Sequence, residues 1–291
     1  MSVDVLQDKI RKTKNPSVVV FDAFSELIPP EILSTEGSFC QAYGIYAGKI
    51  LSALKGVVPA VRFTIGTFAL WGADGLSLLC RLLHQAKEKG YYVLLDMPEL
   101  LSADASEKTA RLFTEETCPY TADGILISSY LGTDALQPFL NLCRRGMTVF
   151  AVVRTANRTA PEIQDLLTGT RLVHMAAGDI VNRCAQQHMG RCGYSHVGVL
   201  ASASSGDSLR SLRSKYKGLF LLLDGYDYPN SNAKNCSFAF DKLGHGAAAC
   251  AGGAILGAWR LLEASSEDYL DAAVQAAERM KKNITRYISV L

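Results

Sequence analysis

The sequence has no long hydrophobic run, and this absence excludes several classes of protein. No stretch reaches the roughly 20 apolar residues that a membrane span requires, and the opening segment MSVDVLQDKIRKTKNPS carries charges where a signal peptide needs an apolar core. Basic blocks are missing too, since the 30 basic and 28 acidic residues are dispersed and give a net charge of +2. We therefore expect a cytoplasmic protein with a small-molecule or protein partner, rather than one that binds nucleic acid or a membrane.

Paired cysteines are also absent. The eight cysteines form no CxxC pair and lie mostly within apolar segments, which predicts reduced, buried thiols and no disulfides. Cys184, His188 and Cys192 follow one another at intervals of four residues and would line one helix face. Eight residues of helix rise about 12 Å, which is too far for the two thiols to share one zinc ion. We expect no metal site there.

What the chain does contain is a regular alternation of strand-like and helix-like segments. Residues 75–90 and 134–146 have the charged ends and glycine stops of helices. Continuous apolar strands joined by helices indicate a parallel sheet. Apolar, β-branched runs of strand length occupy residues 17–24, 60–66, 91–97, 124–130, 148–155, 197–202, 219–226 and 246–253.

Eight such units in about 250 residues match the size of a (β/α)8 TIM barrel. We therefore predict an α/β protein with a single barrel domain over residues 1–291. Residues 266–291 alternate apolar and charged residues at helical spacing and are expected to form a C-terminal closing helix packed outside the barrel. A doubly wound open sheet is the alternative, but no glycine-rich fingerprint follows the first strand, where that fold would bind a dinucleotide.

In barrels of this type the chemistry lies at the carboxyl ends of the strands. Asp22, Arg62 and Asp96 belong to the first three predicted strands, so we expect them to share one site. Each alone also has a structural explanation, because an acid after a strand can cap a helix and an arginine can pair with a nearby acid. The other polar residues at predicted strand ends are Ser128, Ser129, Arg154, Thr155, Asp224 and Asp227.

Several segments resemble the orotidine 5'-phosphate decarboxylase family, specifically its longer bacterial branch. The most specific are YLGTDALQPFL (130–140), VFAVVRTANR (149–158) and LGHGAAACAGGAILGAWR (243–260), and the matching segments follow the family's order along nearly the whole chain. The resemblance implies a (β/α)8 barrel that forms a homodimer with two active sites at its interface. It also implies conversion of orotidine monophosphate to uridine monophosphate without a cofactor.

The resemblance further implies a catalytic pattern, which this sequence only half retains. Family members carry an Asp-x-Lys-x-x-Asp motif after the third strand, and its protonated lysine stabilises and then protonates a carbanion-like centre. Asp22 and Asp96 match family aspartates, and Arg62 stands where the family has a lysine. Pro98 falls on the catalytic lysine and Leu101 on the second aspartate.

The pattern that would bind the rest of the substrate is altered as well. Ala156 replaces a serine that reads the pyrimidine, and Pro229 and Gly253 stand at the glutamine and arginine of the family's phosphate clamp. A ligand phosphate could still meet backbone N–H groups at the start of the last barrel helix, those of Gly252, Gly253 and Ala254. The remaining candidates for ligand binding are Ser129, Thr155 and Asn157.

Three hypotheses follow. We favour a non-decarboxylating paralogue with a degenerate active site, which binds a nucleotide monophosphate or a protein partner as a homodimer or as a heterodimer with an active paralogue. The second is a barrel enzyme with a different reaction, using Asp22, Arg62 and Asp96 together with Asp224 or Asp227, whose carboxylates could hold a divalent metal. The third is a working decarboxylase that takes its lysine from elsewhere, for example Lys108.

Overall fold

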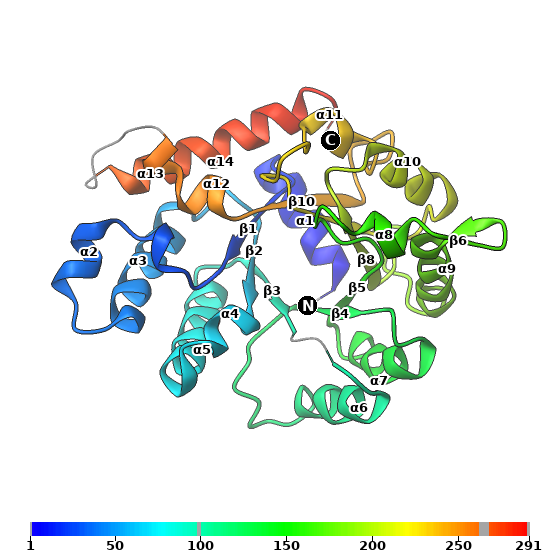
Figure 1. Cartoon of the computed structure of the whole chain (residues 1–291), viewed down its shortest axis with the longest axis horizontal. Helices are drawn as coiled ribbons and strands as arrows, with labels where there is room; N and C mark the ends of the chain where they lie inside the picture. The colour runs from blue at the N-terminus through cyan, green and yellow to red at the C-terminus, as the bar shows by residue number, and fades with distance from the viewer. Residues whose placement is uncertain (1, 98–99, 262–267, 290–291) are drawn as a thin grey trace.

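Eight parallel strands close into a barrel at the centre of the molecule (Figure 1). The computed structural model describes residues 2–97, 100–261 and 268–289. Each strand pairs in parallel with its two neighbours, and the last pairs with the first. In order around the barrel, the strands are β1 (Ser17–Phe21), β2 (Ala60–Thr64), β3 (Tyr92–Asp96), β4 (Gly124–Ser128), β5 (Thr148–Val152), β8 (Val197–Ser202), β9 (Leu221–Asp224) and β10 (Ala247–Ala251). The predicted (β/α)8 barrel and its eight predicted strands are confirmed.

Helices surround the barrel and connect its strands. They are α1 (Val3–Thr13), η1 (Ser25–Leu27), α2 (Pro30–Thr35), α3 (Phe39–Ala53), α4 (Ile65–Ala69), α5 (Gly72–Glu88), α6 (Ala103–Leu112), α7 (Thr133–Cys143), α8 (Pro161–Gln164), α9 (Val173–Ala185), α10 (Gly206–Lys215), α11 (Ala233–Ser237), α12 (Gly253–Leu256), α13 (Ala258–Leu261) and α14 (Tyr269–Thr285). The expected helices at 75–90 and 134–146 are α5 and α7. A short antiparallel hairpin, β6 (Leu167–Thr168) and β7 (Arg171–Leu172), projects beside α8 and α9 (Figure 1).

The expected closing helix is α14. It lies across the outside of the barrel, against α3, α11, α12 and α13 (Figure 1). Its apolar residues face inward, as the alternation of apolar and charged residues predicts, and Ala273, Ala277 and Ile284 are fully buried. Residues 266–267 and 290–291 of the predicted segment lie outside the described ranges.

The barrel interior is filled by side chains that alternate along the strands. Val18 and Val20 of β1 belong to the interior cluster, whereas their neighbours pack beneath the surrounding helices. Helix α1 adds Val3, Leu6 and Ile10 to the same interior cluster, so it closes the amino-terminal end of the barrel. The opposite end, where the strands finish, stays open and is called the mouth below.

The same alternation decides which polar side chains reach the mouth. Asp22, Asp96 and Asp224 each follow, two residues on, an interior residue of β1, β3 or β9. Arg62 occupies an interior position of β2, between the interior Ala60 and the strand end. The alternation along the strands therefore brings three carboxyl groups and one guanidinium group together on the inner surface of the mouth.

Two expectations concerned membranes and thiols. Within the described residues, no helix is both long and apolar enough to cross a membrane. All eight cysteines are free thiols. Helix α9 ends at Ala185, so His188 and Cys192 lie beyond its end and do not share a helix face with Cys184.

Candidate functional site

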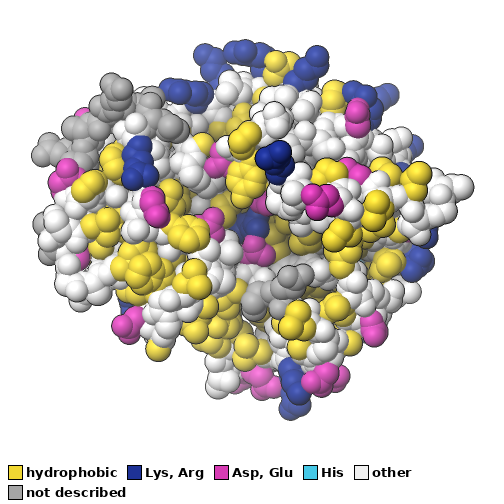
Figure 2. Space-filling view, viewed as in Figure 1, with side chains coloured by type: hydrophobic (Ala, Val, Ile, Leu, Met, Phe, Trp, Pro, Cys, Tyr) yellow, Lys and Arg dark blue, Asp and Glu magenta, His cyan; other side chains and the backbone are white. Residues whose placement is uncertain are grey.

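The mouth holds a cavity of about 210 Å³ lined by acidic side chains. Asp22, Asp96 and Asp224 reach it from three strand ends, Asp227 from the segment after β9, and Arg62 from β2. Figure 2 shows acidic side chains around a basic one in the hollow at the barrel centre. The structure thus brings together Asp22, Arg62 and Asp96, the three residues that the sequence predicts to share one site.

Arg62 is the central feature of this cavity. Its Nη1 donates to Oδ1 of Asp224 at 2.6 Å, and its Nη2 donates to Oδ2 of Asp96. The side chain is only 6% exposed. Burial alone would lower the pKa of Arg62, but the carboxylates of Asp96 and Asp224 raise it well above its ordinary value. Arg62 is therefore a fixed positive charge and cannot deliver a proton to a bound ligand.

Asp22 has a different environment on the same wall. Burial raises the pKa of its carboxyl group, and the nearby Asp96 and Asp224 raise it further, although a hydrogen bond to Thr64 and the charge of Arg62 oppose this. Asp22 therefore holds its proton more tightly than an exposed aspartate does.

The phosphate end of the predicted site is already occupied by a side chain of the chain itself. Oδ2 of Asp227 accepts hydrogen bonds from the backbone N–H groups of Gly252, at 3.0 Å, and Ala254, at 3.1 Å. We expect a ligand phosphate to meet the N–H groups of Gly252, Gly253 and Ala254, and two of these donors face a carboxylate in this structure. A phosphate would have to displace Asp227 and would meet its negative charge.

A second cavity, of about 400 Å³, adjoins the first and shares Asp96 with it. Its wall is mostly apolar, with Leu126 from β4, Val152 from β5 and Ile163 from α8. Thr155 and Gln164 supply polar groups, and Gln164 Oε1 accepts from the backbone N–H of Thr155 at 2.8 Å. The mouth thus has an acidic compartment beside an apolar one with a few polar groups.

Two further predicted ligand-binding residues lie away from the cavity walls. Ser129 is buried and faces outward, where its hydroxyl donates to the carbonyl of Val152 at 2.6 Å. Asn157 accepts a hydrogen bond from the hydroxyl of Thr155 at 2.5 Å without lining either cavity. Ser128, one residue earlier, lines the apolar compartment instead. Period-two alternation from the interior Leu126 would have selected Ser128 rather than Ser129.

The positions that depart from the family pattern are also placed. Leu101 is 87% exposed and Pro229 is exposed. Pro98 lies outside the described residues. Lys108, the alternative source of a lysine, is on α6 and pairs with Asp104 at 2.7 Å, with 76% of its side chain exposed. Within the part of the chain that the structure describes, no lysine lines either compartment of the mouth.

Sequence reasoning left several mouth residues out of the predicted site. Asp224 and Asp227 enter the predicted site only in the hypothesis of a different reaction, and Thr64, Tyr130 and Gln164 are not among the predicted residues. Asp224 could have been found from its alternation with Leu222 in β9. Gln164 had no such signal, because it comes from α8, which is folded back over the barrel from a loop.

The geometry also bears on thiol chemistry and on metal binding at the mouth. Burial raises the pKa of Cys250, on the cavity floor, to about 12, although Arg62 opposes this. The thiol is therefore protonated and a poor nucleophile. Among the described residues, no group of three or more His, Cys, Asp or Glu side chains is arranged to hold a metal ion, so the divalent-metal hypothesis finds no ligand set.

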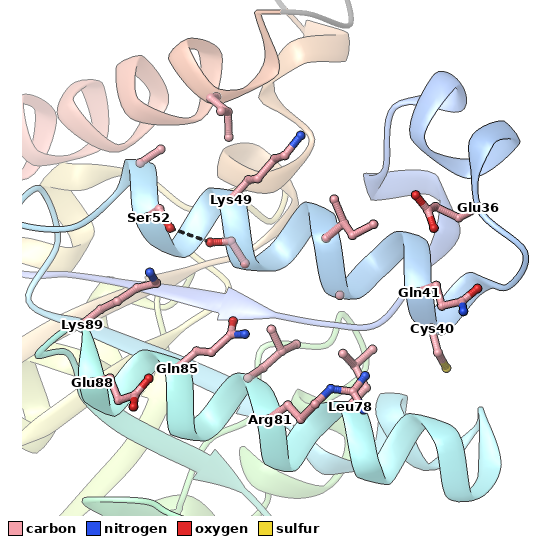
Figure 3. Close-up of a pocket in the computed structure, with 16 residues that line it drawn as sticks. Glu36, Cys40, Gln41, Lys49, Ser52, Leu78, Arg81, Gln85, Glu88 and Lys89 are labelled. Atoms are coloured by element: carbon pink, nitrogen blue, oxygen red, sulfur yellow. Dashed lines mark hydrogen bonds between the residues drawn. The ribbon is translucent and has the colours of Figure 1, made fainter.

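Another cavity, a groove of about 1040 Å³, lies on the outer wall between α3 and α5 (Figure 3). Its rim mixes Lys49, Arg81 and Lys89 with Glu36 and Glu88. Apart from Glu36, which precedes α3, and Lys89, which follows α5, the labelled side chains come from these two helices, outside the strands of the barrel (Figure 3). This groove is separate from the mouth and is not part of the candidate site.

Comparison with curated proteins gives relatives that share one name. The chain is 26% identical over 252 residues to the orotidine 5'-phosphate decarboxylase of Rhodopirellula baltica, covering 83% of each chain. It is 25% identical over 288 residues to that of Clostridium acetobutylicum, covering 98% of this chain and 99% of the relative. No protein-family model matches the chain.

Solved structures with the same fold carry related names. The OMP decarboxylase of Leishmania donovani superposes with a TM-score of 0.76 at 19% identity and covers 99% of both chains. The orotidine 5'-monophosphate decarboxylase of Plasmodium berghei gives a TM-score of 0.72 at 14% identity, covering 96% of this chain and 99% of that one. These structures agree with the barrel fold, and the curated relatives match its sequence almost end to end. The chain is therefore similar, almost end to end, to proteins named orotidine 5'-phosphate decarboxylase.

Proposed function

We propose that this chain is a non-decarboxylating member of the orotidine 5'-phosphate decarboxylase family, whose mouth binds a nucleoside-like ligand without a phosphate group. One observation carries the proposal: Arg62, the only positively charged side chain lining the described mouth, is already bound to Asp96 and Asp224. A ligand therefore meets a cavity in which two carboxylates already pair with the single positive charge.

Decarboxylation requires groups that the mouth does not combine. Loss of CO2 from a pyrimidine requires a nearby cation to stabilise the carbanion-like centre and an acid to protonate it. Arg62 could supply the charge only by leaving its carboxylates, and its raised pKa prevents it from supplying the proton. Asp22 holds a proton more readily, but its ionised form would repel the substrate carboxylate. The residues present do not combine the two functions.

The net charge of the mouth is also unfavourable for the family's substrate. Asp22, Asp96, Asp224 and Asp227 surround one guanidinium group, so the cavity has three uncompensated negative charges when every carboxyl is ionised. Orotidine monophosphate brings a carboxylate and a phosphate, both negative. At short range in a partly buried site, repulsion of this kind disfavours binding strongly. The two hydrogen bonds to Asp227 further deprive a phosphate of its backbone donors.

A neutral ligand suits these two compartments. Carboxylates accept hydrogen bonds, so the acidic compartment fits hydroxyl or amino groups, as on a ribose. The apolar compartment fits a flat ring, with Ser128, Thr155 and Gln164 available to its polar edge. A neutral nucleoside satisfies both, and uridine is the simplest probe of this class.

The test combines a turnover assay with calorimetry. Release of labelled CO2 from carboxyl-labelled orotidine monophosphate measures decarboxylation, and titrations with uridine and uridine monophosphate measure binding. We expect no CO2 release and a higher affinity for uridine than for its monophosphate. Sustained turnover would contradict the proposal, as would tighter binding of the monophosphate. Asp8→Asn, which removes an exposed carboxyl on α1, serves as a control for changes in net charge.

A working decarboxylase is the second candidate, and it is favoured by similarity over 98% of the chain to proteins with that name. It requires a lysine at the reacting centre. Lys108 would have to abandon Asp104 and move from the exposed side of α6. If turnover is observed, Lys108→Met tests this source: a complete loss of activity would identify Lys108 as the catalytic lysine, and unchanged activity would exclude it.

A further inference from the structure

A second polar cleft lies outside the barrel, where α7 and α9 pack together. We call this cavity of about 190 Å³ the outer cleft. Gln137, Asn141 and Arg144 line it from α7 and the residue after its end. Their spacing of four and then three residues places them on one helix face. The other wall holds Arg183, in the last turn of α9, and His188, just beyond the helix.

The charges of the outer cleft are unbalanced. Among the residues that the structure describes, neither Arg144 nor Arg183 has a hydrogen bond or an ion pair through its guanidinium group, and no acidic side chain lines the cleft. A cation in the last turn of a helix does interact favourably with the helix dipole. That effect explains one arginine on each helix, but it does not explain why both border the same cavity.

His188 supplies an independent observation. It is only 9% exposed and lines the cleft. Its backbone N–H donates to the carbonyl of Ala185 at 3.0 Å, and its carbonyl accepts from His196 at 2.8 Å. Its ring nitrogens, in contrast, have no hydrogen-bond partner in the described part of the chain and are open to solvent. Because the ring lines the cleft, its nitrogens are available to a ligand that enters there.

The electrostatics of His188 agree with this reading. Burial lowers the pKa of its imidazole, and the positive charge of Arg144 and the nearby His196 lower it further. The ring therefore lies in a region of positive potential. An anion between Arg144 and Arg183 would oppose that potential and could accept a hydrogen bond from the imidazole.

We propose that the outer cleft binds a small tetrahedral oxyanion of the phosphate type, held by Arg144, Arg183 and His188. The guanidinium group matches oxyanions in geometry as well as in charge. The amides of Gln137, Asn141 and Gln187 offer additional donors around it. The volume equals that of roughly six waters, which leaves room for such an ion and part of its hydration. The proposal does not depend on the function assigned to the mouth.

The test is a calorimetric titration of the full chain with inorganic phosphate at constant ionic strength. We expect Arg144→Gln and Arg183→Gln each to lower the affinity by about tenfold or more, because each removes a charge-assisted hydrogen bond. His188→Gln should have a smaller effect, since glutamine retains a donor. Arg191→Gln is the matched control, because Arg191 is an exposed arginine three residues beyond His188 that does not line the cleft.

Each outcome decides the proposal. Absence of binding up to about 10 mM phosphate, or equal affinity in the wild type and both arginine variants, would overturn it. So would a loss of binding caused by Arg191→Gln to the same extent, because binding would then follow net charge rather than the cleft. Thermal unfolding of each variant shows that it is folded, and Arg183→Lys should keep part of the affinity if charge as well as geometry contributes. Sulfate as a second titrant separates recognition of any tetrahedral oxyanion from recognition of phosphate alone.

Discussion

The mouth and the outer cleft differ in how their positive charges are paired. In the mouth, Arg62 is buried and serves two carboxylates, with further acids around it. In the outer cleft, Arg144 and Arg183 border a cavity that has no acid among its described lining residues. The chain as a whole has a net charge of only +2. The ligand charge that suits a site therefore depends on whether its own charged side chains are paired locally, and the overall composition does not reveal this.

The largest effect is expected from breaking the charge balance of the mouth. Arg62→Met removes the guanidinium group while keeping a side chain of similar length, and it leaves Asp96 and Asp224 without their counter-ion. We expect a loss of about 3–5 kcal/mol in the free energy of unfolding, as for other buried pairs that lose one partner. Urea unfolding measures it.

The control for this change is Arg191→Met, which alters an exposed arginine and should leave the unfolding midpoint nearly unchanged. A loss no larger than that of the control would mean that the two ion pairs at the mouth contribute no stability.

Leu101 offers the next largest expected effect, because it tests whether a second copy of the chain binds there. The family resemblance implies a dimer. We therefore expect Leu101, which is 87% exposed in one chain, to be covered by the second chain of that dimer. Since burying a leucine contributes about 1.5–3 kcal/mol and a symmetric dimer contains two copies, Leu101→Asp should weaken dimerisation roughly 100-fold or more. Sedimentation measures this against Leu167→Asp, which changes a leucine on the β6–β7 hairpin that is 73% exposed. A monomeric wild type would contradict the expectation.

Asp227 allows a test, with a smaller expected effect, of which ligand charge the mouth accepts. Asp227→Asn keeps an oxygen that accepts hydrogen bonds from Gly252 and Ala254 but removes the negative charge. Affinity for uridine monophosphate should rise by about tenfold, the effect of one charged interaction, whereas affinity for uridine should change little. An equal rise for both ligands would mean that Asp227 acts on the whole cavity rather than on the phosphate end.

Much of this architecture could be predicted from the sequence. The strands, the closing helix and the meeting of Asp22, Arg62 and Asp96 follow from the period-two alternation and from the parallel topology. The occupation of the backbone donors by Asp227 does not follow, because it depends on how the segment after β9 folds back on α12. The outer cleft was also hidden, since Arg144 and His188 come from ends of different helices that only tertiary packing brings together.

The smallest effect tests the proton on Asp22. Because the folded-state pKa of Asp22 is raised, chiefly by burial, the neutral form favours folding, and this contribution is lost as the pH rises through the folded pKa. Asp22→Asn mimics the neutral form and can still accept a hydrogen bond from Thr64. It should therefore unfold at higher urea concentration than the wild type at pH 7, with the difference disappearing below the ordinary aspartate pKa of about 3.9. Asp8→Asn should show no such difference. If Asp22→Asn instead destabilises the protein at pH 7, the attraction between ionised Asp22 and Arg62 outweighs the cost of burying its charge, and the mouth would tolerate more negative charge than its single arginine suggests.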